Sequence, residues 1–129
     1  MAFGQIGWID LTVANATELR DFYQSVTGWI PAPVSMGSYQ DYCMHPPGQE
    51  PGSEQPVAGI CHATGQNTGL PPVWLIYITV PDLDASLIAC VEGGGKLLRA
   101  TESMGNMGRF CVIQDPAGAA CALFEPAKP

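Results

Sequence analysis

The chain has 129 residues, of which 47% are hydrophobic, and twelve acidic against five basic residues give a net charge of −7. This length predicts a single domain, residues 1–129, which buries enough surface to fold without disulfides or a structural metal. So acidic a surface is repelled by phosphate backbones and anionic lipids, which excludes nucleic acid and membrane surfaces as expected partners.

The N-terminal segment MAFGQIGWIDLTV lacks the basic flank and the cleavage site of a signal peptide, and its pattern favours a strand. The five cysteines are an odd number and form no CxxC pair. Such cysteines are typical of reduced, buried thiols. We therefore expect a cytoplasmic protein.

The first expected elements are a strand in GWIDLTVAN (7–15) and an amphipathic helix after it. Asn15 with Glu18 resembles a capping box at the start of this helix, and Gly28 is expected to end it. Its apolar residues recur at the helical period i, i+3, i+4 and i+7: Leu19, Phe22, Tyr23 and Val26. Three β-prone runs complete this half of the chain: Ile30–Val34, Gln40–Met44 and Val57–Ala63.

The second half repeats this order, because WLIYITVPD (74–82) echoes the first strand. Asp82 is expected to cap a helix that closes at Gly93–Gly95. The apolar face of this helix is predicted to comprise Leu83, Leu87 and Val91. Three β-prone runs follow again: Lys96–Arg99, Arg109–Gln114 and Ala119–Phe124. The pattern predicts an α+β fold of two tandem βαβββ repeats, about 5–63 and 73–126, joined by the link 64–72.

Strand alternation predicts which side chains the helices cover. Ile9, Leu11 and Val13 form an apolar side that the first helix must cover, so their neighbours face the other way. The repeat extends this uncovered face to both halves: Trp8, Asp10 and Thr12, then Leu75, Tyr77 and Thr79. A mixed polar and aromatic face inside a curved sheet predicts the wall of a ligand cavity.

Three segments carry a recognisable pattern: WIDLTVANATELRDFYQSVTGW, WLIYITVPDLDASLIACVEGGGK and GRFCVIQDPAGAACALFEP. Together they resemble the vicinal oxygen chelate superfamily, which includes glyoxalases, bleomycin-resistance proteins and extradiol dioxygenases. The resemblance implies a cup-shaped, mostly antiparallel curved sheet with the helices outside, often in a dimer that holds a divalent metal. It implies little about the reaction, because one fold supports many chemistries.

The family's usual metal ligands are a histidine early in the first strand of a repeat and a glutamate in the last strand. Carried over to this chain, the histidine positions fall on Trp8 and Leu75. The glutamate positions fall on Ala122 and, by a looser alignment, on Ile60. None of these side chains can donate to a divalent metal, so we expect no cofactor.

A rearranged divalent-metal site is the alternative. Asp10, Tyr77 and His62 each stand two residues beyond one of those positions. Asp10 and Tyr77 are equivalent in the repeat and are expected near each other. If the last strand of a repeat runs antiparallel to the first, however, His62 is displaced away from both.

Five residues are candidates for ligand contact: Trp8, Asp10, His62, Tyr77 and Arg109. A carboxylate among apolar neighbours, such as Asp10, needs either a hydrogen-bonding partner or a ligand. Arg109 is the cation expected beside the cup, with a surface role as the alternative. Trp8 would either line the pocket or fill the space of a metal. In an enzyme, Asp10 or His62 would act as the base.

Two classes of function remain open from these residues. The first is a metal-independent protein that binds a small organic ligand, and the second is a lyase, isomerase or dioxygenase-type enzyme. A structural or regulatory role is a further alternative. We also expect a homodimer, because three presumed edge runs carry no lysine, arginine or glutamate to deter pairing. These runs are Ile30–Val34, Val57–Ala63 and Ala119–Phe124.

Overall fold

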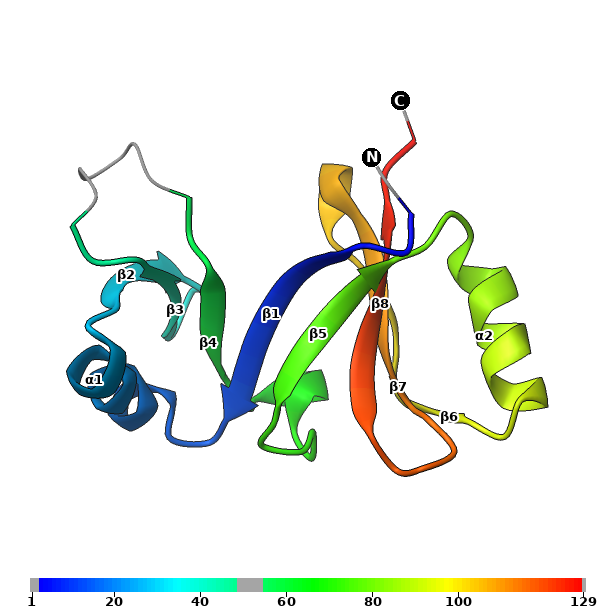
Figure 1. The fold of residues 1–129 in the computed structure, drawn as a ribbon, viewed down its shortest axis with the longest axis horizontal. Helices are drawn as coiled ribbons and strands as arrows, with labels where there is room; N and C mark the ends of the chain where they lie inside the picture. The colour runs from blue at the N-terminus through cyan, green and yellow to red at the C-terminus, as the bar shows by residue number, and fades with distance from the viewer. Residues whose placement is uncertain (1–2, 49–54, 129) are drawn as a thin grey trace. The chain divides into compact units, whose positions relative to one another are not determined.

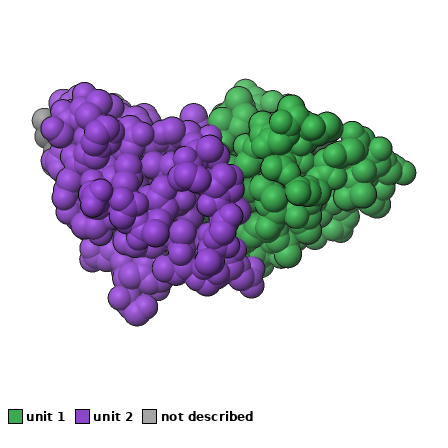
Figure 2. All heavy atoms as spheres, turned by 90° about the horizontal axis from the view of Figure 1, so that it is seen from below, with its two compact units in different colours: residues 1–8, 75–129 green, residues 9–74 purple. Residues whose placement is uncertain are grey.

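The computed structural model describes residues 3–48 and 55–128. The chain divides into two compact units, residues 9–74 (unit 2) and residues 1–8 with 75–129 (unit 1), which are coloured separately in Figure 2. The start of the chain groups with the second half because its backbone bonds there. Gly4 N–H donates to the Thr79 carbonyl at 2.7 Å, and Thr79 N–H donates to the Gln5 carbonyl at 2.9 Å.

The first repeat comprises β1 (Ile6–Val13), α1 (Ala16–Thr27), β2 (Ile30–Ser35), β3 (Gln40–His45) and β4 (Ala58–His62). Its strand order is β2-β3-β4-β1. The pairs β2–β3 and β3–β4 are antiparallel, whereas β1–β4 is parallel. A short 3-10 turn, η1 (Gly65–Asn67), lies in the predicted link.

The second repeat comprises β5 (Trp74–Thr79), α2 (Leu83–Glu92), β6 (Lys96–Ser103), β7 (Gly108–Gln114) and β8 (Ala120–Pro126). The turn η2 (Gly105–Met107) joins β6 to β7. The order is β5-β8-β7-β6, again with one parallel pair, β5–β8. The α+β class and the two tandem βαβββ repeats are therefore confirmed (Figure 1). The predicted cup depends on the placement of the units and stays a prediction.

The last strand of each repeat runs parallel to the first, so the antiparallel arrangement considered from the sequence is wrong. The reason is the route of the chain. The helix after the first strand returns the chain to the starting edge, and three alternating strands then end in the original direction.

Each helix packs on the sheet through a narrower stripe than the sequence predicts. In α1, Leu19 and Tyr23 contact the core of the first repeat, but Phe22 and Val26 are 53% and 63% exposed. The prediction that these two residues pack against the first strand is wrong, because they lie beside the contact stripe. In α2, Leu83 and Leu87 pack inward, whereas Val91 is exposed.

Two of the three runs presumed to be sheet edges are interior strands. β4 lies between β3 and β1, and β8 lies between β5 and β7. Of the three, only β2 is at an edge, and β6 is the edge strand of the second repeat. Within residues 3–48 and 55–128, neither helix combines the length and the apolar character that crossing a bilayer requires.

Candidate functional site

The strands of each repeat have two faces, which we call the helix face, packed on the helix, and the far face, opposite to it. In the first repeat Leu11, Tyr42 and Ile60 form a core with α1 and so define the helix face. Asp10 alternates with Leu11 and therefore lies on the far face, where its register partner is Gly59. Asp10 is only 7% exposed. Its predicted orientation, away from α1, is confirmed.

The same register corrects the position of the family glutamate in the first repeat. In the second repeat Tyr77 is the partner of Ala122. The equivalent pair in the first repeat is Asp10 and Gly59, so the glutamate position falls on Gly59. Ile60 is one residue further on and is fully buried on the helix face. The looser alignment was therefore wrong by one residue.

His62 ends β4 and does not lie beside Asp10. Its register partner is Val13, three residues along β1 from Asp10. The Asp41 carboxylate accepts a hydrogen bond from the His62 backbone N–H at 2.9 Å, and its Oδ1 lies 3.3 Å from the His62 Nδ1. The rings of Tyr39 and Tyr42 also contact the imidazole, with centroids 5.5 and 6.3 Å away. His62 is thus held at the strand end by Asp41.

The far face of the first repeat is acidic and holds thiols. Asp10 and Asp41 lie on this face with Cys43 and Cys61. Burial raises the pKa of the Cys61 thiol, and the nearby carboxylates of Asp10 and Asp41 raise that pKa further. Because a nucleophile or a metal ligand must be a thiolate, this protonated thiol is suited to neither role.

The far face of the second repeat follows a row of register partners across four strands. Tyr77 lies beside Ala122, Ala122 beside Val112, and Val112 beside Arg99 of the edge strand β6. Ala122 and Val112 are fully buried, as is Leu75 on β5. Arg99 therefore introduces a charge into an otherwise apolar row.

A register shift in β6 aims Arg99 at this face. Between the pairs Leu97–Ile113 and Arg99–Val112, β6 advances two residues while β7 advances one. A regular strand would keep Leu97 and Arg99 on the same face, and the added residue turns Arg99 to the far face. A second shift before the pair Glu102–Phe110 brings Glu102 to that face as well.

Arg99 is 7% exposed and is held by both an aromatic ring and a carboxylate. Its Cζ lies 4.7 Å from the centroid of the Phe110 ring, and its Nη2 donates to the Glu102 carboxylate. The Tyr77 ring stands 5.9 Å from that of Phe110. Burial lowers the pKa of Arg99 from its usual value, and Tyr77 acts in the opposite direction. The sequence prediction missed Arg99, although an arginine within a β-prone run was a usable signal.

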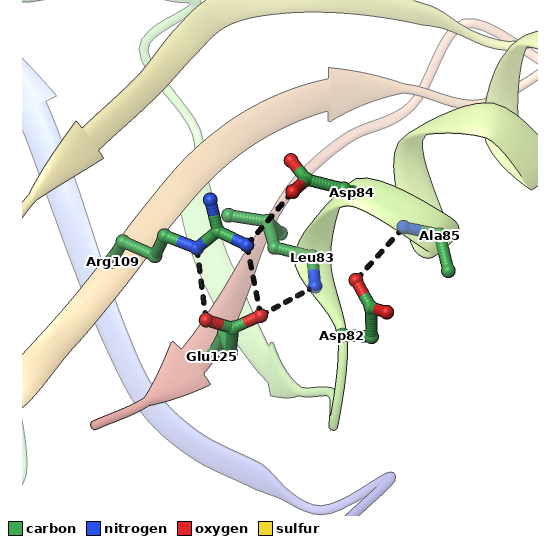
Figure 3. Close-up of polar contacts among 6 residues, drawn as sticks. All are labelled: Asp82, Leu83, Asp84, Ala85, Arg109 and Glu125. Carbon is green, nitrogen blue, oxygen red and sulfur yellow. Dashed lines mark hydrogen bonds and ion pairs between the residues drawn. The ribbon is translucent and has the colours of Figure 1, made fainter. Parts of the chain in front are cut away.

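Arg109, the cation predicted beside the cup, lies instead on the helix face (Figure 3). Its Nε donates to Glu125 at 2.8 Å and its Nη2 to Asp84 at 3.2 Å. Glu125 also accepts the backbone N–H of Leu83, in the first turn of α2, at 2.8 Å. Arg109 stabilises the ionised form of this carboxylate, and the Leu83 N–H adds to the effect, so the pKa of Glu125 falls to about 2. These contacts fasten the start of α2 to β7 and β8.

The residues at the family's metal positions do not fit that metal. Leu75, Ala122 and Gly59 have no donor atom in their side chains, and Trp8, half-buried in β1, has only an indole N–H. Among the residues that the structure describes, no three histidine, cysteine or acidic side chains are grouped to hold an ion.

The comparisons with known proteins agree with this fold. A family model described as the Glyoxalase/Bleomycin resistance protein/Dioxygenase superfamily matches residues 5–123. "Putative glyoxylase CFP32" of Mycobacterium tuberculosis is 32% identical over 127 residues, which are 95% of this chain and 46% of that protein. "Anthracycline biosynthesis protein DnrV" of Streptomyces peucetius is 29% identical over 122 residues, 95% of this chain and 42% of that protein. The chain thus spans about half the length of these relatives.

Solved structures are similar in fold alone. Methylmalonyl-CoA epimerase from Mycobacterium tuberculosis has a TM-score of 0.55 at 18% identity, covering 99% of this chain and 93% of the other. The hypothetical protein BH1468 from Bacillus halodurans has the same TM-score at 11% identity, covering 97% and 96%.

Proposed function

The chain belongs to the Glyoxalase/Bleomycin resistance protein/Dioxygenase superfamily, and we propose that it binds a small organic ligand on one of the far faces of its strands without the usual family metal. The observation that carries the proposal is the chemistry at the metal positions. Both glutamate positions are filled by small residues, Gly59 and Ala122, and one histidine position by the buried Leu75. The surrounding far faces keep aromatic and polar side chains that suit an organic ligand.

The names of the relatives support a small organic ligand, since one is called a "putative glyoxylase" and another an "anthracycline biosynthesis protein". Each far face is proposed as a separate contact surface: Asp10 is the candidate contact in the first repeat, and Tyr77 with Trp8 are the candidates in unit 1. His62 is not carried into this proposal, because its register partner Val13 lies on the helix face. Arg109 is not carried into the proposal, because two carboxylates on the helix face hold its guanidinium.

Elemental analysis tests the absence of the metal. The purified protein, dialysed against metal-free buffer, is expected to hold no stoichiometric divalent ion. A near-equimolar ion that is lost on Asp10→Ala or His62→Ala would refute the proposal and establish a rearranged site.

A fragment screen by NMR tests ligand binding, and a screen without any ligand on either far face would also refute the proposal.

A second candidate is an enzyme of the lyase, isomerase or dioxygenase type. The contact between His62 and Asp41 favours it, because an imidazole oriented by a carboxylate is a common general base. Asp10, buried on the far face, is the other candidate base. Incubation of the protein with any ligand found in the screen, followed by product analysis, separates the two functions. Turnover abolished by Asp10→Asn or His62→Gln would establish the enzyme.

We also propose a homodimer in the cytoplasm. The edge strands β2 and β6 offer backbone groups that a second copy can pair with, although Pro31 and Pro33 blunt β2. All five cysteines are free thiols, which suits a reducing compartment. Sedimentation equilibrium tests the dimer, and a mass that stays near 13.7 kDa at high micromolar concentration would refute it.

A further inference from the structure

The far face of the second repeat holds one cluster around a buried charge: Arg99 with Glu102, Phe110 and Tyr77. Burying an arginine carries a desolvation penalty, which is offset only when charged and hydrogen-bonding partners are well placed. One register shift in β6 aims Arg99 at this face and a second brings Glu102 to it, whereas a regular strand would have kept Arg99 on the face of Leu97. Bulges are over-represented at sheet edges, where β6 lies, and also beside active sites. A buried guanidinium that a bulge directs inward is therefore a candidate for function.

The partners of Arg99 have the form of an anion-binding site. A guanidinium is planar and binds carboxylates through parallel N–H groups. Here its Cζ lies over the Phe110 ring, with Tyr77 beside that ring, and its Nη2 donates to Glu102. The Glu102 side chain is 44% exposed, so this carboxylate reaches Arg99 from the solvent side. An outside carboxylate can take the same route when Glu102 swings away.

We propose that Arg99 binds the anionic group of a planar organic acid, which displaces the Glu102 carboxylate and places its conjugated ring beside Phe110 and Tyr77. The proposal rests on the proposed ligand-binding function and names the chemical class of the ligand: an aromatic or conjugated carboxylate. The charge of Arg99 selects the anion. The two rings select a flat partner, because aromatic rings pair best in stacked or edge-on contact.

The first experiment uses the wild-type protein and three matched probes, followed by amide chemical shifts. The probes are 2-naphthoate, its neutral analogue 2-naphthamide, and the saturated decahydro-2-naphthoate. We expect 2-naphthoate to bind at least tenfold more tightly than the other two, with shifts gathered on β5, β6, β7 and β8. Equal binding of the amide, or shifts confined to the first repeat, would overturn the proposal.

Variants then test the two charged residues in opposite directions. Arg99→Gln is expected to weaken 2-naphthoate binding about tenfold or more. Glu102→Gln is expected to strengthen it several-fold, because the internal competitor is removed. A merely structural ion pair would make both changes neutral or harmful to binding, and that result would refute the exchange. If Arg99→Gln does not fold, Arg99→Lys keeps the charge but not the planar fork, and unchanged binding in it would refute planar recognition.

Arg20→Gln is the matched control. It removes one positive charge from α1 in the first repeat, where the half-buried Arg20 pairs with Asp21 and lies over the Tyr42 ring, and should leave binding unchanged. An equal loss in Arg20→Gln would attribute the effect to net charge and refute the role of Arg99. Failure of this inference is distinct from failure of the proposed function: neutral fragments that bind a far face refute the ligand class only, whereas the absence of any ligand refutes both.

Discussion

The two repeats have the same order of elements and nearly opposite chemistry on their far faces. In the first repeat the far face holds the carboxylates of Asp10 and Asp41 beside protonated thiols. In the second, the corresponding face holds the guanidinium of Arg99 against Phe110, within a row of buried apolar residues. In each repeat the helix face packs into an apolar core. The far faces, which the helices do not cover, hold different side chains in the two repeats and are therefore the place to look for function.

The helices also begin differently in the two repeats. Asp82 caps α2 by accepting the Ala85 N–H at 3.1 Å, and Glu125 and Arg109 add a second fastening. Asn15 makes no capping bond to the backbone of α1 and instead donates to the Glu18 side chain at 3.1 Å. The predicted capping box is therefore wrong in its geometry. Four predictions test how far these differences between the repeats extend.

The largest effect is expected from the core of the first repeat. Ile60→Ala should lower the free energy of unfolding by about 2–5 kcal/mol, because Ile60 is fully buried on the helix face. Cys61→Ala, one residue along on the far face, should cost about 1 kcal/mol or less. Urea denaturation of both variants measures the difference. Equal losses would show that the two faces are assigned wrongly.

The next effect is a dependence of stability on pH that is specific to the second repeat. Because Arg109 and the Leu83 N–H lower the pKa of Glu125 to about 2, from an ordinary value near 4.5, its contribution is complete above pH 4.5. It is lost as the pH falls from about 4.5 to 2. Glu125→Gln should therefore lower the melting temperature at pH 7 and make no difference near pH 2. Thermal unfolding across this range is the measurement, and a pH-independent difference would contradict it.

A smaller effect should separate the two helix starts. Asp82→Ala removes a side-chain cap and should cost about 1 kcal/mol. Asn15→Ala removes only a contact between exposed side chains and should cost a few tenths of that amount. Chemical denaturation of the pair gives the comparison. A cost for Asn15→Ala as large as that for Asp82→Ala would restore the predicted capping box.

The smallest effect concerns the thiols of the acidic far face. Asp41→Asn removes one of the carboxylates that raise the pKa of Cys61, so its alkylation by iodoacetamide at pH 8 should quicken a few-fold. The increase is small because burial, the main cause of the raised pKa, remains. Cys111, whose pKa burial raises to about 11 in the second repeat, is the internal control. Mass spectrometry measures both alkylation rates. An unchanged rate at Cys61 would show that the Asp41 carboxylate does not influence this thiol.

Much of the molecule follows from local patterns in the sequence. Alternation placed Asp10 opposite α1, and the helical period located both helices, which end near the predicted glycines. Gly28 adopts the left-handed conformation, with φ 79°, that a helix end favours. These features depend on neighbours along the chain, and so the sequence alone determined them.

Only the tertiary structure decided the chemistry of the far faces. Alternation along β6 would put Arg99 on the face of Leu97, and one register shift against β7 reverses that placement. In the same way, the contact of His62 with Asp41 depends on the pairing of β4 with β3. Register and bulges are properties of two strands distant in the sequence, because cross-strand hydrogen bonds set them. The alternation of side chains along one strand therefore does not predict where a register shift against the partner strand occurs.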